Sequence, residues 1–138
     1  MRALHSYTWL LLTVLALATA CKKTRTTADL TIAKLEGIWL ISHEENKGDT
    51  LVYRPQTYPF PPARGRTGFA IKSYGRFEQF DIAPTDGLIG RPGAWTLDRK
   101  IYLHIRLTQG QDPSYTLQIL ELDSVNQILK VRRLPENE

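Results

Sequence analysis

The sequence is poor in residues on which many folds and functions depend. Its 138 residues include one cysteine, one methionine and three histidines, and the formal net charge is only +4. A single cysteine cannot form an intramolecular disulfide bond, so the core alone has to hold the domain together. The positive charges are scattered rather than gathered in one dominant run. This pattern argues against a nucleic-acid-binding protein.

Motifs that carry catalytic chemistry are also missing. The chain has no Gly-x-Ser-x-Gly motif, no phosphate-binding loop and no dinucleotide fingerprint. His43 lacks the second histidine four residues later that a zinc-binding helix would need, and His104 alternates with polar residues on one strand face. Glu78 and Asp81 fall on opposite faces of a predicted strand and cannot form a close carboxylate pair. We therefore expect no enzyme activity, no metal and no cofactor.

Residues 1–20 have the pattern of an export signal. A short basic start precedes the apolar run 9–17, which is too short to span a hydrocarbon core of about 30 Å as a permanent helix. The last three residues of the signal are small, and Cys21 follows them directly. This arrangement resembles the lipobox of bacterial lipoproteins, with Ala18 where that family prefers Leu.

The lipobox resemblance implies that Cys21 becomes the first mature residue, with a diacylglyceryl thioether and an acylated amine. The alternative is an ordinary secretory signal, with Cys21 as an incidental thiol. Several acyl chains hold a protein durably, because each buried methylene contributes about 0.8 kcal/mol. We expect residues 21–29 to form a lipidated tether. Because Lys22 rather than an acidic residue follows Cys21, the resemblance favours the outer membrane of a bacterial envelope.

Beyond Gly37 the hydrophobic pattern has period two, which predicts β-strands. Residues 101–108 are the clearest case, because apolar and polar side chains alternate without a break. Turns such as Tyr74-Gly75 and Asp98-Arg99 are so short that adjacent strands must be antiparallel. The eight predicted strands lie near residues 37–44, 50–54, 67–73, 76–82, 93–97, 101–108, 115–122 and 128–134.

These strands predict an all-β domain over residues 30–138. No long helical period interrupts them, so a parallel α/β fold is disfavoured, and a short helix is expected only near residues 29–35. Eight antiparallel strands suit a closed up-and-down barrel, whose interior is either filled by side chains or holds one small ligand. A two-sheet sandwich is the alternative. We expect the domain to be a monomer.

Gly37 and Trp39 open the first strand directly after the short helix. This Gly-x-Trp motif resembles the start of a lipocalin-like domain. The resemblance implies that Trp39 closes one end of the barrel and that an arginine near the last strand packs across its indole. Arg132 and Arg133 lie in that region, and Arg133 is favoured because it shares a strand face with Leu129 and Val131.

The segment from Tyr53 to Arg66 contains four prolines and cannot be a regular central strand. A second polar loop is expected over residues 83–92. In a meander barrel, loops two strands apart emerge at the same end, so side chains of the two loops are expected to meet around one mouth. The residues concerned are Tyr58, Phe60, Arg64, Arg66, Asp86 and Arg91.

This predicted mouth leaves two functional hypotheses and one structural alternative. It is a rim for an acidic or amphipathic small ligand, or the Pro-rich loop 55–66 is an arm that docks onto another envelope protein or inhibits an enzyme. The structural alternative is a loop that folds over one end of the barrel and seals it. We favour a membrane-anchored, lipocalin-like lipoprotein that binds a small apolar or amphipathic ligand.

Overall fold

The computed structural model of the protein describes residues 27–85, 87–111 and 113–135. The predicted signal, Cys21 and Asp86 lie outside these residues. The elements are the helix α2 (Thr27–Leu35), the strands β1 (Gly37–Ile41) and β2 (Thr50–Pro55) with the 3-10 turn η1 (His43–Glu45) between them, β3 (Gly68–Lys72), β4 (Arg76–Ile82), β5 (Leu88–Asp98), β6 (Tyr102–Leu107), β7 (Ser114–Asp123) and β8 (Ile128–Leu134).

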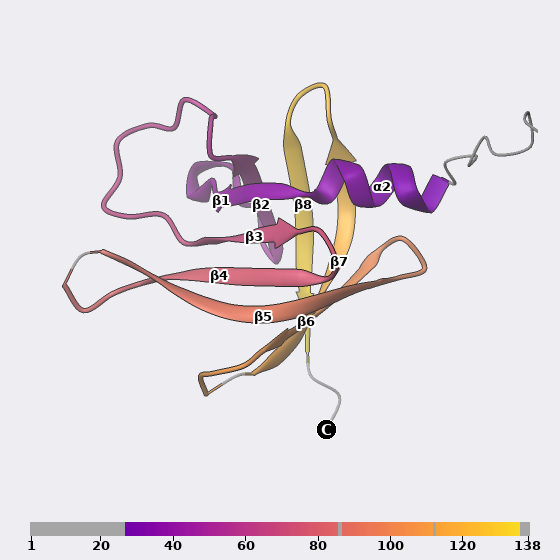
Figure 1. Ribbon diagram of the computed structural model, residues 1–138. Helices are drawn as coiled ribbons and strands as arrows, with labels where there is room; N and C mark the ends of the chain where they lie inside the picture. Colours follow the sequence, from indigo (N-terminus) through magenta and orange to yellow (C-terminus); the bar gives the residue numbers. More distant parts are fainter. Residues whose placement is uncertain (1–26, 86, 112, 136–138) are drawn as a thin grey trace, which may run out of the picture.

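The strands form one closed antiparallel barrel that follows a short helix (Figure 1). This confirms the expected all-β, eight-stranded barrel and excludes the two-sheet sandwich. Strands β3 to β8 follow one another in chain order, whereas β1 lies between β2 and β3. The chain that leaves β2 must therefore pass β1 to reach β3. Residues 56–67, which we call the crossing segment, make this connection, and that task explains their length.

Two predicted strand boundaries were wrong. The first strand ends at Ile41 rather than at residue 44, because Glu44 and Glu45 in η1 form ion pairs with arginines of neighbouring segments. The strand expected over 93–97 begins at Leu88, so the second predicted loop is half strand. Pro92 fits there because residues 88–92 pair with β4, while the register with β6 begins only at Gly93.

The antiparallel pairing gives the barrel two distinct ends. The helix end carries α2, the start of β1 and the turns β3–β4, β5–β6 and β7–β8. The opposite end, which we call the mouth end, carries η1 and the turns β4–β5 and β6–β7. In Figure 1, α2 and the β5–β6 turn lie on the right, whereas the crossing segment and the β4–β5 turn lie on the left.

Trp39 closes the helix end together with α2. Its indole Nε1 donates a buried hydrogen bond of 2.8 Å to the carbonyl of Leu35, the last residue of α2. Gly37 joins the two elements at φ 145°, a backbone conformation that residues with a Cβ rarely adopt. The helix is thereby fixed across the barrel end, with Leu35 completely buried.

Inward-facing side chains fill the interior above this closure. Phe69 packs against Tyr53 and Phe77, with ring centroids 4.8 and 5.5 Å apart. The buried cluster consists of Leu35, Trp39, Ile41, Tyr53, Phe69, Ile71, Phe77, Trp95, Leu103, Ile105, Leu107, Tyr115, Leu117, Leu129 and Val131. Its members come from α2 and all eight strands, so the barrel is stabilised by one continuous apolar core.

We predict that Leu35→Ala lowers the free energy of unfolding by about 2–5 kcal/mol, because a buried leucine is replaced by a cavity. Leu120→Ala is the matched control, since Leu120 on β7 is exposed and its truncation should cost less than about 0.5 kcal/mol. Urea unfolding followed by tryptophan fluorescence measures both. Equal costs would contradict the packing of α2 onto the barrel.

Candidate functional site

Two arginine–glutamate pairs lie beside the crossing segment, and the pair formed by Arg66 attaches the segment to η1. Arg66, at the end of this segment, donates from Nη2 to Glu44 Oε1 (2.6 Å) and from Nη1 to Glu44 Oε2 (3.0 Å). It also donates to the carbonyls of Ile41 and Pro61. Arg66 is buried, and these four bonds satisfy both of its terminal nitrogens.

The second pair has the same design one residue further along η1. Arg54 on β2 donates from Nε and Nη2 to Glu45, at 2.8 and 2.5 Å. Each arginine also lies over an aromatic ring of the crossing segment, Arg54 over Tyr58 at 4.7 Å and Arg66 over Phe60 at 4.6 Å. The two rings meet edge to face, with centroids 5.0 Å apart. Both aromatic side chains therefore serve to hold the segment in place.

These contacts lower the pKa of both glutamates. The hydrogen bond from Arg66 is the main cause that lowers the pKa of Glu44 from 4.5 to about 2, and the hydrogen bond from Arg54 lowers the pKa of Glu45. The two guanidinium groups have raised pKa values for the same reason. The attachment of the crossing segment is therefore ionic over the whole neutral pH range.

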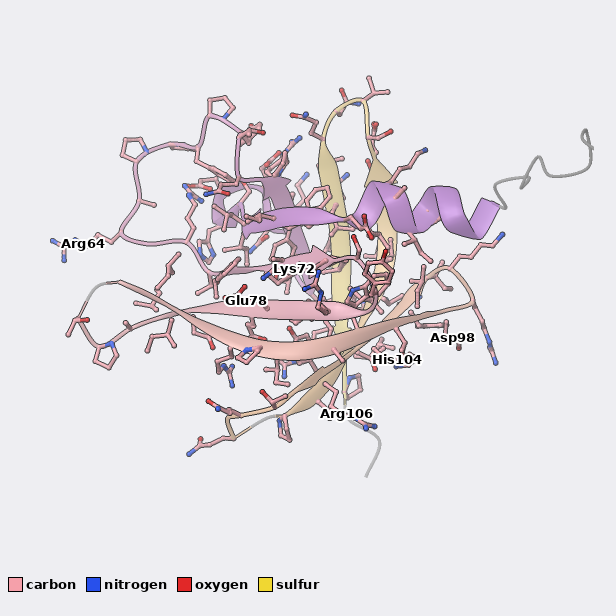
Figure 2. The ribbon with its side chains drawn as sticks, in the orientation of Figure 1. Arg64, Lys72, Glu78, Asp98, His104 and Arg106 are labelled. Carbon is pink, nitrogen blue, oxygen red and sulfur yellow. The ribbon has the colours of Figure 1, made fainter. Side chains whose placement is uncertain are left out.

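The predicted rim residues do not form one group. Tyr58, Phe60 and Arg66 lie together in the crossing segment, whereas Arg91 lies on β5 and donates from Nε to Asp81 Oδ2 at 2.5 Å. Figure 2 shows Arg64 pointing outward from the crossing segment, on the opposite side of the view from His104 and Arg106. The segment does come close to the β4–β5 hairpin, since Gly65 lies beside Ile82.

The residues that do come together lie inside the barrel near its mouth end. Tyr115 on β7 donates its hydroxyl proton to Gln79 Oε1 at 2.8 Å, and Gln79 Nε2 donates to Asp81 Oδ1 at 2.9 Å. The pair Asp81–Arg91 continues this chain of polar contacts. Arg133 on β8 lies over the Tyr115 ring, with Cζ 4.5 Å from the centroid. We call these five residues, together with Tyr53, the mouth cluster.

Arg133 occupies a different place from the one that the lipocalin resemblance implies. The register pairs Trp39 with Pro55 and Tyr53 with Leu129, so Trp39 lies level with the chain just before β8 begins. Arg133 is near the other end of β8, where it meets Tyr115 instead of the indole. Its neighbour Arg132 faces outward and pairs with Asp49, its Nε lying 2.7 Å from Oδ2.

Tyr53 contributes a hydroxyl to the mouth cluster from β2. The residue is only 9 % exposed, and its hydroxyl has no hydrogen-bond partner among the described residues. Burial raises the pKa of Tyr53 to about 12, while the positive charge of Arg133 acts in the opposite direction. Burial also raises the pKa of Tyr115, and the charge of Arg133 again opposes it. Both phenols are therefore protonated donors at neutral pH.

Sequence reasoning identified two members of the mouth cluster, Arg133 and Arg91, but assigned them to other neighbours. The missed residues carry a recognisable signal. Gln79 and Asp81 continue the inward row that begins with Phe77, just as Arg133 continues the row of Leu129 and Val131. A polar residue at the end of an apolar inward row marks the place where a barrel interior meets water.

A groove of about 850 Å³ lies on the outer wall of the barrel, and Tyr115 of the mouth cluster is among the residues that line it. It runs over the outer faces of β5, β6 and β7 and is bordered by Leu134 and Pro135. His104 and Arg106 line it, and His104 Nδ1 lies 2.9 Å from Thr116 Oγ1. Strand alternation explains this placement, because both residues are on the outward face of β6.

Residues 27–85, 87–111 and 113–135 contain neither a metal-binding cluster nor a membrane-spanning helix. In this part of the chain no three or more histidine, cysteine, aspartate or glutamate residues gather closely enough to hold a metal ion. The described helices also include none with the length and apolar character needed to cross a bilayer.

Comparisons of the chain with protein-family models, with curated proteins and with solved structures find no match. The function therefore has to be argued from the geometry of the chain itself.

We predict that the Glu44 carboxyl titrates near pH 2, because protonation breaks its hydrogen bonds with Arg66. Since the folded pKa lies below 4.5, the ionised carboxylate stabilises the fold above that pH, and the stabilisation is lost as pH falls toward 2. Carboxyl NMR of the labelled protein measures the midpoint.

The variant Arg66→Met tests the cause of this shift. It should return the Glu44 midpoint toward its ordinary value and leave the lowered pKa of Asp123, which is caused by hydrogen bonds within its own turn, unchanged. A Glu44 midpoint that does not respond to Arg66→Met would show that the ion pair is not what lowers the pKa.

Proposed function

We propose that this protein is a lipocalin-like lipoprotein of the bacterial envelope, anchored through Cys21, whose barrel binds the acidic group of a small amphipathic ligand at its mouth. The closed eight-stranded barrel with Trp39 at the closed end supports the lipocalin-like part of this proposal. The small-residue run that ends at Cys21 supports the anchor.

The observation that carries the ligand proposal is that Arg133 lies close enough to Tyr53 for its positive charge to act on the Tyr53 hydroxyl. Tyr53 is 9 % exposed as a residue, and its hydroxyl forms no hydrogen bond with the described residues. No carboxylate of the described residues forms an ion pair with Arg133, although its guanidinium lies over Tyr115. The hydroxyl of Tyr53 and the exposed guanidinium of Arg133 are both free of protein partners among the described residues, and one carboxylate or phosphate oxygen can accept hydrogen bonds from both.

Neighbouring charges favour an anion at this place. Arg91 is neutralised by Asp81 in the same cluster, so the positive charge of Arg133 is left over. The hydroxyl of Tyr115 donates its hydrogen bond to Gln79, and this bond fixes the Tyr115 ring beneath Arg133. The guanidinium is thereby held by stacking, with its donors free to form the bidentate contact that carboxylates accept.

Apolar side chains next to the mouth cluster suit the rest of an amphipathic ligand. Ile82, Leu88 and Ile89 on the β4–β5 hairpin are each about half exposed, and they lie at the mouth end. The register pairs Ile89 with Asp81, so Ile89 continues the inward face of the polar cluster. Because aromatic and aliphatic side chains fill the deeper interior, the ligand is expected at the mouth and not in the centre of the barrel.

Docking to another protein through the Pro-rich loop remains the second candidate. Residues 61–65 of the crossing segment are exposed, and Arg64 projects from it. The segment's aromatic side chains are already engaged with Arg54 and Arg66, however, and a docking arm would have to use the prolines and Arg64 alone.

The anchor is tested by metabolic labelling with an alkynyl fatty acid in a bacterial host. The wild-type protein should take up the label and fractionate with membranes, whereas Cys21→Ser should lose both properties, since no other cysteine exists to carry a thioether. Equal labelling of the two proteins would overturn the lipoprotein assignment.

The ligand proposal is tested with octanoate and octan-1-ol on the chain from residue 21 onward carrying Cys21→Ser. We expect Arg133→Gln to weaken octanoate binding about tenfold or more, because a hydrogen bond to a charged group contributes about 1.5–3 kcal/mol. Tyr53→Phe should weaken it less, because the lost hydrogen bond is uncharged on the protein side. Isothermal titration calorimetry measures both.

Arg132→Gln is the matched control for this experiment. Arg132 is the sequence neighbour of Arg133 but faces outward to Asp49, so octanoate affinity should not change. Octan-1-ol lacks the acidic group, and its affinity should be the same for wild type and Arg133→Gln. Octanoate binding that survives Arg133→Gln would rule out the mouth cluster as the binding site.

A further inference from the structure

Three hairpin turns project from the helix end of the barrel. Tyr74, in the β3–β4 turn, is 97 % exposed, and Val125, in the β7–β8 turn, is 87 % exposed. These are the most exposed large hydrophobic side chains of the described residues, and both lie at the same end. Arg99 and Lys100 form the third turn, between β5 and β6.

All three turns contain left-handed residues, and Gln127 at φ 52° is the one in the β7–β8 turn. Tyr74 has φ 60° beside Gly75 at φ 71°, and both Arg99 and Lys100 are left-handed, at φ 48° and 64°. Asn and Gly are the residues that adopt this geometry at low cost. Exposed Tyr, Arg and Lys side chains repay none of the strain through packing within the chain. Two-residue hairpin turns require positive φ at both central residues, so the unusual feature of these tips is that exposed Tyr, Arg and Lys stand where Asn and Gly are usual.

The unpaired charges at this end are mostly positive. Arg76 and Lys34 are exposed beside the turns, and no described carboxylate pairs with either. Asp123 accepts hydrogen bonds from Val125 and Asn126 within its own turn, which lower its pKa, and its negative charge also interacts with Lys34. Asp98 lies 3.7 Å from Arg99, and Glu36 is the remaining acid near α2.

The proposed anchor is attached to the same end. Five residues separate Cys21 from Thr27, where α2 begins, and the six peptide steps between them span at most about 20 Å. A lipid on Cys21 would thus keep the helix end within reach of the membrane surface. This step rests on the lipoprotein assignment made above.

We infer that the helix end is a membrane-docking face that recognises a surface containing anionic phospholipid. Tyr74 and Val125 enter the interfacial layer, where a tyrosine keeps its ring among apolar groups and its hydroxyl in water. Arg99, Lys100 and Arg76 contact the acidic headgroups, each adding electrostatic attraction close to the surface. The mouth cluster, at the opposite end, then faces away from the membrane.

The test uses full-length lipidated protein in mixed phosphatidylcholine–phosphatidylglycerol vesicles. An environment-sensitive fluorophore is attached to Tyr74→Cys or Val125→Cys, and Leu88→Cys, half exposed at the mouth end, is the matched control. Because Cys21 is the only native cysteine and carries the lipid, the introduced thiol is the only reactive one. We expect labels at 74 and 125 to shift to blue emission and to be quenched by brominated lipid, and the label at 88 to do neither.

Charge reversal identifies the lipid that is recognised. Lys100→Glu should abolish the blue shift of the label at 125, whereas Lys47→Glu, an exposed lysine at the mouth end, should leave it unchanged. The same loss should follow when phosphatidylglycerol is omitted.

Two results would overturn the inference, and they differ in what else they overturn. Equal emission and quenching at 74, 125 and 88, with Cys21 unreactive, would reject the docking face but keep the anchor. Labelling of the wild-type protein would show a free Cys21, and this would reject the anchor and the docking face together.

Discussion

The pairing of Arg66 with Glu44 is the contact on which the rest of the barrel depends. Strand β1 lies between β2 and β3, so the chain must pass it before the regular meander can begin. Arg66 ends that passage by binding Glu44 and the carbonyl of Ile41 at once, which joins the crossing segment to the end of β1. Arg54 and Glu45 repeat the arrangement beside it. Two buried or half-buried ion pairs do here what a disulfide cannot do in a chain with one cysteine.

The alternation of apolar and polar residues in the sequence predicts most of the strands. It does not predict which strands lie next to each other in the barrel. The period-two pattern of residues 101–108 predicts β6, and Tyr74-Gly75 predicts the turn between β3 and β4, because both signals are local. Alternation states which face a side chain occupies but not which strand lies beside it, so the position of β1 between β2 and β3 could not be foreseen. For the same reason, the contact between Arg133 and Tyr115 could not be predicted, because these residues are close only through the pairing of β7 with β8. Pro92 caused a different error, because it favoured a loop where the chain forms the first half of β5. A proline is tolerated in a strand at a position where one side of the strand has no paired neighbour.

The two ends of the barrel differ in whether their polar groups have partners within the chain. At the helix end, the indole of Trp39 donates to the last carbonyl of α2, and an otherwise orphaned helix terminus is satisfied by the core itself. At the mouth end, the inward rows finish in polar residues, and the chain supplies partners for Gln79, Asp81 and Arg91 but not for the Tyr53 hydroxyl. The first end is complete without a ligand, whereas the second has donors left over. This asymmetry is why a binding site is proposed at one end and a membrane contact at the other.

A filled interior and a binding function are compatible in so small a barrel. Without disulfides the domain needs the stabilisation that Phe69, Trp95 and Leu103 provide by packing in its centre, and a deep cavity would remove part of it. A ligand bound at the mouth would cost less stability than one in a deep cavity. Tyr115 is already held by Gln79 and stacked under Arg133 before any ligand binds. An acidic group placed there gains a stacked cation and the Tyr53 hydroxyl as donors, and little side-chain freedom remains to be lost. A site of this kind selects ligands by the charge of their headgroup more than by the length of their apolar tail.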